Sequence, residues 1–222
     1  MKFSGRHFPK DVILTTLRWY LRYKLSYRDV EELIGERGLK VDHSTVNRWV
    51  IKYAPLLAAV ARRHKRAVGL SWRLDETYIK VAGGWKYYYR AVDKEGDTID
   101  FLLTAKRDKL AAICFLRQAI PNNCTPVKIN IDKSASNTSA IKAYNDEAGT
   151  YIEIRQCKYL NTIVEQSHRP VKLKTRAALG FKAFHCAHAI VLGVEVVQMI
   201  RKGQVRPVSE GSFIDQFNSL AA

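Results

Sequence analysis

Residues 74–81 read Leu-Asp-Glu-Thr-Tyr-Ile-Lys-Val, in which apolar and polar side chains nearly alternate, the period of a β-strand buried on one face. Residues 85–92 and 98–104 repeat this period. Gly83-Gly84 separates the first two stretches, and the turn-forming run 93–97 separates the second from the third. The pattern predicts three antiparallel strands joined by two hairpins.

The chain after residue 104 alternates between helical and strand patterns. We expect a helix at 108–119, a short buried strand at 127–131, a helix at 137–147, a strand at 151–155, a long helix from about Asn161 and a last helix at 183–202. Added to the hairpins, this order is that of a ribonuclease-H-like α/β domain, a mixed sheet flanked by helices. We place the domain at 71–204, and a loose tail at 205–222.

The N-terminal part, residues 1–60, has only helical patterns. Apolar side chains recur at helical spacing over residues 10–53, which predicts three helices. Ser26 is suited to cap a helix with Asp29 at its third position, Gly38 is suited to end it, and Asp42 or Ser44 can cap the next. This all-α region therefore has the form of a helix-turn-helix.

In a helix-turn-helix that binds DNA, the early exposed residues of the second helix contact base edges. Here those residues are His43, Thr45, Asn47 and Arg48, and we expect Val46, Trp49 and Val50 to point inward. Helical hairpins also occur in proteins that never touch DNA, so the pattern leaves both interpretations open.

The charge of the chain favours the DNA-binding interpretation. Lys and Arg number 37 against 21 Asp and Glu, a net charge of +16 at pH 7, which draws a protein to polyanions. We expect no membrane span, because no apolar run approaches the roughly 20 residues it needs. The N-terminus lacks the pattern of a secretory signal, and the four cysteines lack zinc-site spacing, so we expect a cytoplasmic protein with reduced cysteines.

A basic run at 61–69 precedes the predicted sheet. We interpret residues 61–70 as a linker between the domains. It is either merely solvated or it follows a DNA backbone, in which case the contacting residues are Arg62, Arg63, Lys65 and Arg66.

Three acids stand out in the sheet domain. Asp75 occupies a strand face where apolar packing is expected, Asp132 ends the short buried strand, and Glu165 lies one turn into a helix in a basic stretch. Each alone has a structural explanation, such as a helix salt bridge from Glu165 to Arg169. Together they suit phosphoryl transfer on DNA, for which carboxylates can hold two Mg²⁺ ions about 4 Å apart.

Several motifs are similar to one known family. They are residues 72–78 (Trp-Arg-Leu-Asp-Glu-Thr-Tyr), 131–134 (Ile-Asp-Lys-Ser), 158–161 (Lys-Tyr-Leu-Asn) leading to Glu165, and 179–182 (Leu-Gly-Phe-Lys). With residues 26–29 and 41–45 of the helix-turn-helix, they closely resemble the small bacterial DDE transposases of the insertion-sequence-six family over about residues 8–204.

The resemblance implies a ribonuclease-H-like core in which Asp75, Asp132 and Glu165 bind two Mg²⁺ (or Mn²⁺) ions. It implies a DNA transposase whose N-terminal domain binds the terminal inverted repeats of an insertion sequence and which cleaves 3′ ends and joins them to target DNA, by a replicative route that forms cointegrates. Lys172 stands where the family carries a basic residue near the DNA. Because two element ends must be paired, we expect at least a homodimer on double-stranded DNA.

Two positions depart from the family pattern. Ser167 stands where relatives generally have an acid, and Pro170 can kink the helix by removing a backbone donor. They motivate the alternatives of a catalytically inactive DNA-binding regulator of transposition and of a nuclease with the same fold. We expect further DNA contacts from His168 and Arg169, with packing as the alternative for His168, and we expect residues 85 and 87–89, Trp-Tyr-Tyr-Tyr, to pack in the core.

Overall fold

The computed structural model describes residue 3 and residues 7–206 and 211–221. The chain divides into two compact units, one of Ala67–Lys172 and one that combines Met1–Arg66 with Leu173–Ala222. We call them the sheet unit and the helical unit.

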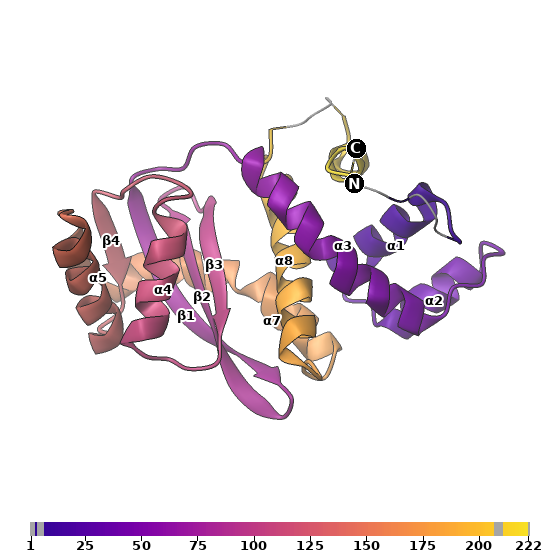
Figure 1. Cartoon of the computed structure of the whole chain (residues 1–222), viewed down its shortest axis with the longest axis horizontal. Coiled ribbons are helices and arrows are strands. Elements are labelled where there is room, and N and C mark those ends of the chain that lie inside the picture. The colour runs from indigo at the N-terminus through magenta and orange to yellow at the C-terminus, as the bar shows by residue number, and fades with distance from the viewer. Residues whose placement is uncertain (1–2, 4–6, 207–210, 222) are drawn as a thin grey trace. The chain divides into compact units, whose positions relative to one another are not determined.

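The sheet unit contains a five-stranded mixed sheet in the order β3-β2-β1-β4-β5 (Figure 1). β1 pairs antiparallel with β2, and β2 with β3, whereas β4 runs parallel to β1 and β5 parallel to β4. This is the ribonuclease-H-like arrangement that the order of elements predicted. The strands are β1 (Ser71–Val81), β2 (Gly84–Asp93), β3 (Thr98–Thr104), β4 (Lys128–Ile131) and β5 (Glu153–Gln156).

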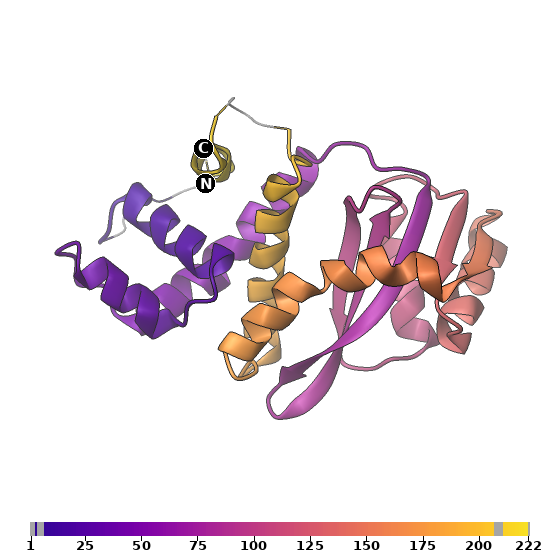
Figure 2. The ribbon, with the colours of Figure 1, turned by 180° about the vertical axis from the view of Figure 1, so that it is seen from behind.

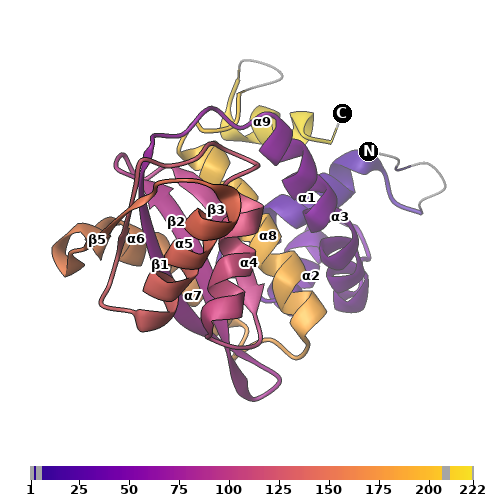
Figure 3. The same cartoon turned by 60° about the vertical axis from the view of Figure 1, so that its left-hand side comes forward.

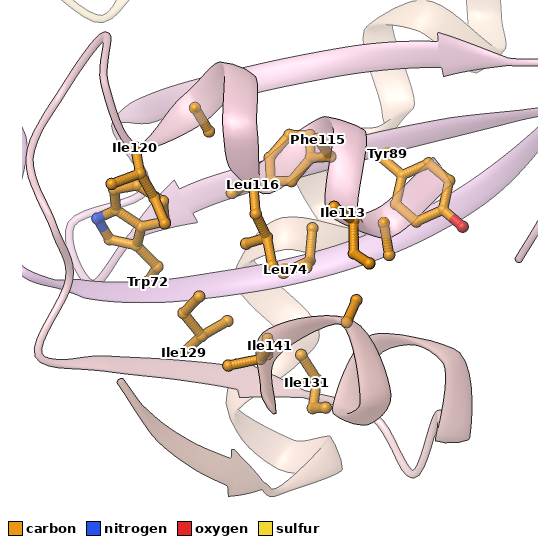
Figure 4. Close-up of a cluster of buried hydrophobic side chains, with 14 of the residues drawn as sticks. Trp72, Leu74, Tyr89, Ile113, Phe115, Leu116, Ile120, Ile129, Ile131 and Ile141 are labelled. Atoms are coloured by element: carbon orange, nitrogen blue, oxygen red, sulfur yellow. The ribbon is translucent and has the colours of Figure 1, made fainter. Parts of the chain in front are cut away.

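One face of the sheet is covered by α4 (Lys109–Ala119) and α5 (Ala135–Ala148), as Figures 1 and 3 show. Alternate side chains of β1, including Trp72 and Leu74, enter the core on this side, where they pack with Phe115, Leu116 and Ile141 of the helices (Figure 4). Burial of this apolar surface holds the strands in register.

The opposite face of the sheet is crossed by the segment after β5 (Figure 2). It comprises a 3-10 turn, η1 (Lys158–Asn161), and α6 (Thr162–Ser167), which contact the strands. α7 (Arg169–Ala177) follows, and the boundary between the two units lies within it. The expected single long helix is thus interrupted at His168, two residues before Pro170. Proline lacks the N–H that a continuous helix would use there, but in the first turn of α7 that donor is not required.

The helical unit holds the N-terminal helices α1 (Lys10–Arg22), α2 (Tyr27–Gly35) and α3 (His43–Arg63), together with α8 (Phe184–Arg201) and α9 (Phe213–Ser219). The expected caps are present: Ser26 and Asp29 form a capping box at α2, and Asp42 caps α3. α8 packs along α3 and α1. It has the length and apolarity of a membrane span, but 67% of the apolar window is buried inside the protein, as in a core helix.

The boundaries of the units differ from the predicted domains. We assigned the helix at 183–202 to the 71–204 domain, whereas α8 belongs to the helical unit because its apolar side chains pack on α3 and α1. In the expected 61–70 linker, residues 61–63 complete α3, and Lys65 forms a β-bridge with Val205. The predicted loose tail contains α9, with Phe217 fully buried; residues 207–210 and 222 of that tail lie outside the described residues.

Candidate active site

Asp75 lies on β1, and Asp132 directly follows β4, the parallel neighbour of β1. The register of β1 and β4 pairs Trp72 with Ile129 and Arg73 with Asn130. Asp75 lies two residues beyond Arg73 on β1, and Asp132 lies two residues beyond Asn130, directly after the end of β4, so the two aspartates follow the same paired residues. Asp75 points to the face opposite the core of Figure 4, because its neighbour Leu74 belongs to that core. The two carboxylates therefore lie together beneath the crossing segment.

Asn161, at the end of η1, ties the crossing segment to both strands. Its side chain is fully buried and its Nδ2 donates to Asp132 Oδ1 (3.0 Å) and to the backbone oxygen of Leu74 (3.4 Å). Asn130 of β4 in turn donates to Asn161 Oδ1. The amide thus orients the Asp132 carboxylate. Sequence reasoning missed this role, although Asn161 precedes Glu165 by four residues, one helical turn.

His168 holds the other aspartate. Its side chain is 1% exposed and its Nε2 lies 3.0 Å from Asp75 Oδ2. Because a carboxylate only accepts hydrogen bonds, Nε2 carries the proton. The ring also packs edge-to-face on Tyr88 of β2. The sequence left His168 between a DNA contact and a packing role, and it did not indicate Asp75 as its partner. Its burial leaves no surface for that contact and gives it a packing and positioning role.

Glu165 lies between these two anchors on α6. It follows Asn161 by four residues and precedes His168 by three, the spacings of one helix face, and it is exposed. Its oxygens, however, do not lie within 4.8 Å of those of both aspartates. Among the described residues, the one acid-and-histidine group that meets this limit is Glu31, Asp42 and His43 in the helical unit. The glutamate side chain is exposed to solvent.

The electrostatics of this cluster suit a cation. Within the described residues, no Lys or Arg nitrogen lies within 4.0 Å of the Asp75, Asp132 or Glu165 carboxylates. Two adjacent aspartates without a counter-ion repel each other, and oxygen donors are what Mg²⁺ prefers. The donor set thus fits a divalent metal.

The comparisons with known proteins agree with this geometry. A family model described as a DDE domain matches residues 69–204. The transposase for the insertion sequence-like element IS431mec of Staphylococcus aureus is 40% identical over 206 residues, which cover 90% of this chain and 88% of the relative. The chain belongs to the DDE transposases of the insertion-sequence-six family.

A second relative matches equally well, and the solved structures differ more. The transposase for IS257 in transposon Tn4003 of Staphylococcus aureus is also 40% identical over 90% of this chain and 88% of its own. Among solved structures, the HTLV-2 integrase catalytic core domain with magnesium, in a trimeric form, aligns at 16% identity and a TM-score of 0.49 over 64% of this chain and 97% of that one. This protein is a DNA transposase that cleaves and joins DNA.

The predicted base-reading residues of the transposase lie on α3. Val46, Trp49 and Val50 are buried, which confirms the inward face. Arg48 is exposed and donates to Thr45, and Asn47 is half-buried. His43 is less available than expected, because its Nδ1 lies 2.9 Å from Glu31 Oε2 of α2.

The basic residues predicted to follow the DNA backbone have mixed surroundings. Arg63 and Arg66 are exposed and Arg62 and Lys65 are half-buried. The backbone of Arg66 donates to Gln204, so this stretch is fixed rather than free. Arg169 and Lys172 are both exposed on α7. Because the helix is interrupted at His168, the seven-residue spacing from Glu165 no longer fixes the face of Lys172.

One aromatic residue departs from the expected core packing. Tyr88 and Tyr89 are buried, whereas Trp85 is 63% exposed. It lies near the tip of the β1–β2 hairpin, beyond the residues of β2 that pair with β3. The alternation of side chains along β2 predicted the face of the sheet on which Trp85 lies. It did not predict that the pairing of β2 with β3 stops at Tyr87, which leaves Trp85 uncovered.

Proposed function

We propose that this transposase binds the terminal inverted repeats of an insertion sequence with α3, and that Asp75, Asp132 and Glu165 hold two Mg²⁺ or Mn²⁺ ions at the scissile phosphate. The observation that carries the proposal is that Asp75 on β1 and Asp132 directly after the parallel strand β4 are each held by a buried side chain of the segment that bears Glu165.

When bound, the ions would supply the positive charge that phosphoryl transfer needs at the phosphorus centre. The protein's own part is to fix the ligands. Asn161 holds Asp132, and protonated Nε2 of His168 holds Asp75, so both carboxylates keep one oxygen free. Glu165 is exposed on the same side, where it would complete the ligand set as DNA arrives.

We further infer a replicative reaction that forms cointegrates, a homodimer or larger assembly on double-stranded DNA, and action in the cytoplasm. Pro170 does not argue against activity, because it lies in the first turn of α7, where its missing N–H has no helical acceptor to lose. Ser167 forms no hydrogen bond to the three acids in the described chain. Both departures from the family pattern therefore leave the bonds that hold Asp75 and Asp132 in place.

The test uses a supercoiled plasmid carrying the DNA that flanks the gene, with a target plasmid and Mg²⁺. We expect joined products from the wild type. Asp75→Asn, Asp132→Asn and Glu165→Gln should abolish them and still bind the repeats. Asp146→Asn is the matched control, because this exposed acid on α5 lies outside the site.

Three outcomes would contradict the proposal. Repeat binding by the wild type without any nicking would indicate an inactive regulator. Nicking without joined product would indicate a nuclease. Activity retained by any of the three site variants would remove that residue from the metal site.

A further inference from the structure

The turn between α7 and α8 contains a leucine in a conformation that leucine rarely adopts. Leu179 has φ +51° and is followed by Gly180 at φ +88°. Glycine usually occupies such a helix end, since a side chain there costs about 1–2 kcal/mol. Leu179 is also 93% exposed, so no packing compensates for the strain. Strain of this kind is kept where the surroundings impose it and points to a function.

The turn presents this leucine rigidly. On one side Gly180 donates its N–H to Thr175 and Leu179 donates to Arg176, which closes the end of α7. On the other side Phe181 is 5% exposed and anchors the chain before α8. The turn is visible between α7 and α8 in Figure 2. Leu179 is therefore held at the tip of a fixed turn, with its side chain in solvent.

The start of α3 lies beside this turn within the helical unit. A hollow of about 590 Å³ is lined by Leu179 and Lys182 from the turn and by His43, Ser44 and Asn47 from the first turns of α3. Arg28 of α2 lines it as well. Arg28 and Lys182 are both exposed. The hollow thus separates an apolar tip from the base-reading helix and is bordered by two cations.

Duplex DNA presents matching features in the same spatial order as α3, the hollow and Leu179. With α3 in the major groove, the next feature across the surface is one sugar–phosphate backbone and then the minor groove. A backbone strand in the hollow would meet Arg28 and Lys182, which suit phosphates. The exposed tip would then reach the minor groove, where leucine side chains are known to wedge between base pairs.

We propose that Leu179 inserts from the minor groove between two base pairs of the inverted repeat, while Arg28 and Lys182 hold the backbone between it and α3. The inference rests on the proposed function, since it requires α3 in the major groove of the repeat. It assigns to the turn a role in the choice of DNA sequence, because a base-pair step that unstacks easily costs less free energy to open.

The test compares Leu179→Ala and Leu179→Gly with Leu110→Ala, which removes another exposed leucine, from α4. Repeat duplexes carry 2-aminopurine at successive steps beside the site protected by α3, and its fluorescence rises when a step is unstacked. We expect wild type and Leu110→Ala to raise the fluorescence at one step. Both Leu179 variants should lose that signal and bind about 10-fold more weakly. Leu179→Gly should melt at or above the wild-type temperature, because glycine relieves the strain.

Three results would overturn the inference. If the wild type binds the repeat but no step is unstacked, or if the Leu179 variants keep both signal and affinity, Leu179 is not a wedge and the proposed function stands. If the wild type does not bind the repeat at all, repeat binding and the wedge fail together.

Discussion

His168 and Lys174 are buried polar side chains whose roles the sequence did not disclose. The three acids could be selected from the sequence because each interrupts a local pattern, and the position of Asp132 at a strand end follows from that pattern. The residues that hold the aspartates could not be selected from the sequence, because the contacts of His168 and Asn161 depend on how η1 and α6 cross the sheet. Sequence spacing shows a helix face, and only tertiary structure shows what that face meets.

His168 acts through Asp75. We expect His168→Leu to lower the joining rate about 10–100-fold and to raise the Mg²⁺ concentration needed, as loss of a group that orients a metal ligand does. Repeat binding should not change. His168→Gln, which keeps a donor, should recover most of the activity. An unchanged Mg²⁺ dependence in His168→Leu would show that His168 only packs.

Lys174 closes the end of α1. Its Nζ donates to the backbone oxygens of Tyr20 (2.6 Å), Leu25 (2.7 Å) and Tyr23 (3.3 Å), and it is 4% exposed. Burial lowers the pKa of Lys174 from its usual 10.5 to about 7, against the attraction of Asp29. The unfolded chain therefore holds a proton that the folded protein releases above pH 7.

This pKa predicts a pH dependence. Because the folded pKa of a basic group is depressed, the free energy of unfolding should rise with pH between 7 and 10.5, by at most roughly 5 kcal/mol at 1.36 kcal/mol per pH unit. Urea unfolding of wild type and Lys174→Met across this range measures it. The variant should show a flatter curve, and parallel curves would contradict the prediction.

At the scale of elements, the strands and helices of the sheet unit lie within a few residues of their predicted positions, because hydrophobic period and caps are local signals. Two elements differ. α3 runs to Arg63, past the expected start of the linker, and the glutamate helix is divided at His168. The division reflects Pro170 together with the burial of His168 against Asp75, and the second of these causes is not local.

The packing of α8 against α1 and α3 predicts that a methyl group added at Gly193 destabilises the fold. A Cβ at Gly193 would lie 2.5 Å from Leu21 Cδ2 and 3.1 Å from Ala54 Cβ, both of them buried. Such overpacking costs about 1–3 kcal/mol, more than the gain of about 1 kcal/mol in helix propensity. We expect Gly193→Ala to lower the melting temperature and to weaken repeat binding.

Gly35, at the end of α2, is the matched control. A Cβ there meets nothing within 4 Å, so Gly35→Ala should leave the melting temperature unchanged or raise it. Equal effects of the two substitutions would show that α8 does not pack as described.

At the scale of the whole molecule, the net charge of +16 predicts a strong salt dependence of DNA binding. If six to ten phosphates are contacted, affinity should fall about 10³–10⁵-fold between 50 and 200 mM salt. Exchange of a contacting residue, such as Lys172→Gln or Arg63→Gln, should reduce the slope of log affinity against log salt by about 1. A slope that neither substitution changes would exclude both residues from the DNA contact.

The sequence did not predict which parts of the chain make up each of the two units. α8 is apolar along most of its length, so its sequence shows that it is buried but not which unit buries it. Its assignment to the helical unit depends on side chains such as Leu21 and Ala54, which are more than a hundred residues away in the chain.

That arrangement has a consequence for protein synthesis. The helices expected to bind the element ends need α8 as part of their core, and α8 follows the whole sheet unit in the chain, so the helical unit can assemble only after the sheet unit and α8 have been synthesised. A product cut short by a premature stop codon would lack the core helix, and it could not occupy the ends as a competitor of intact molecules.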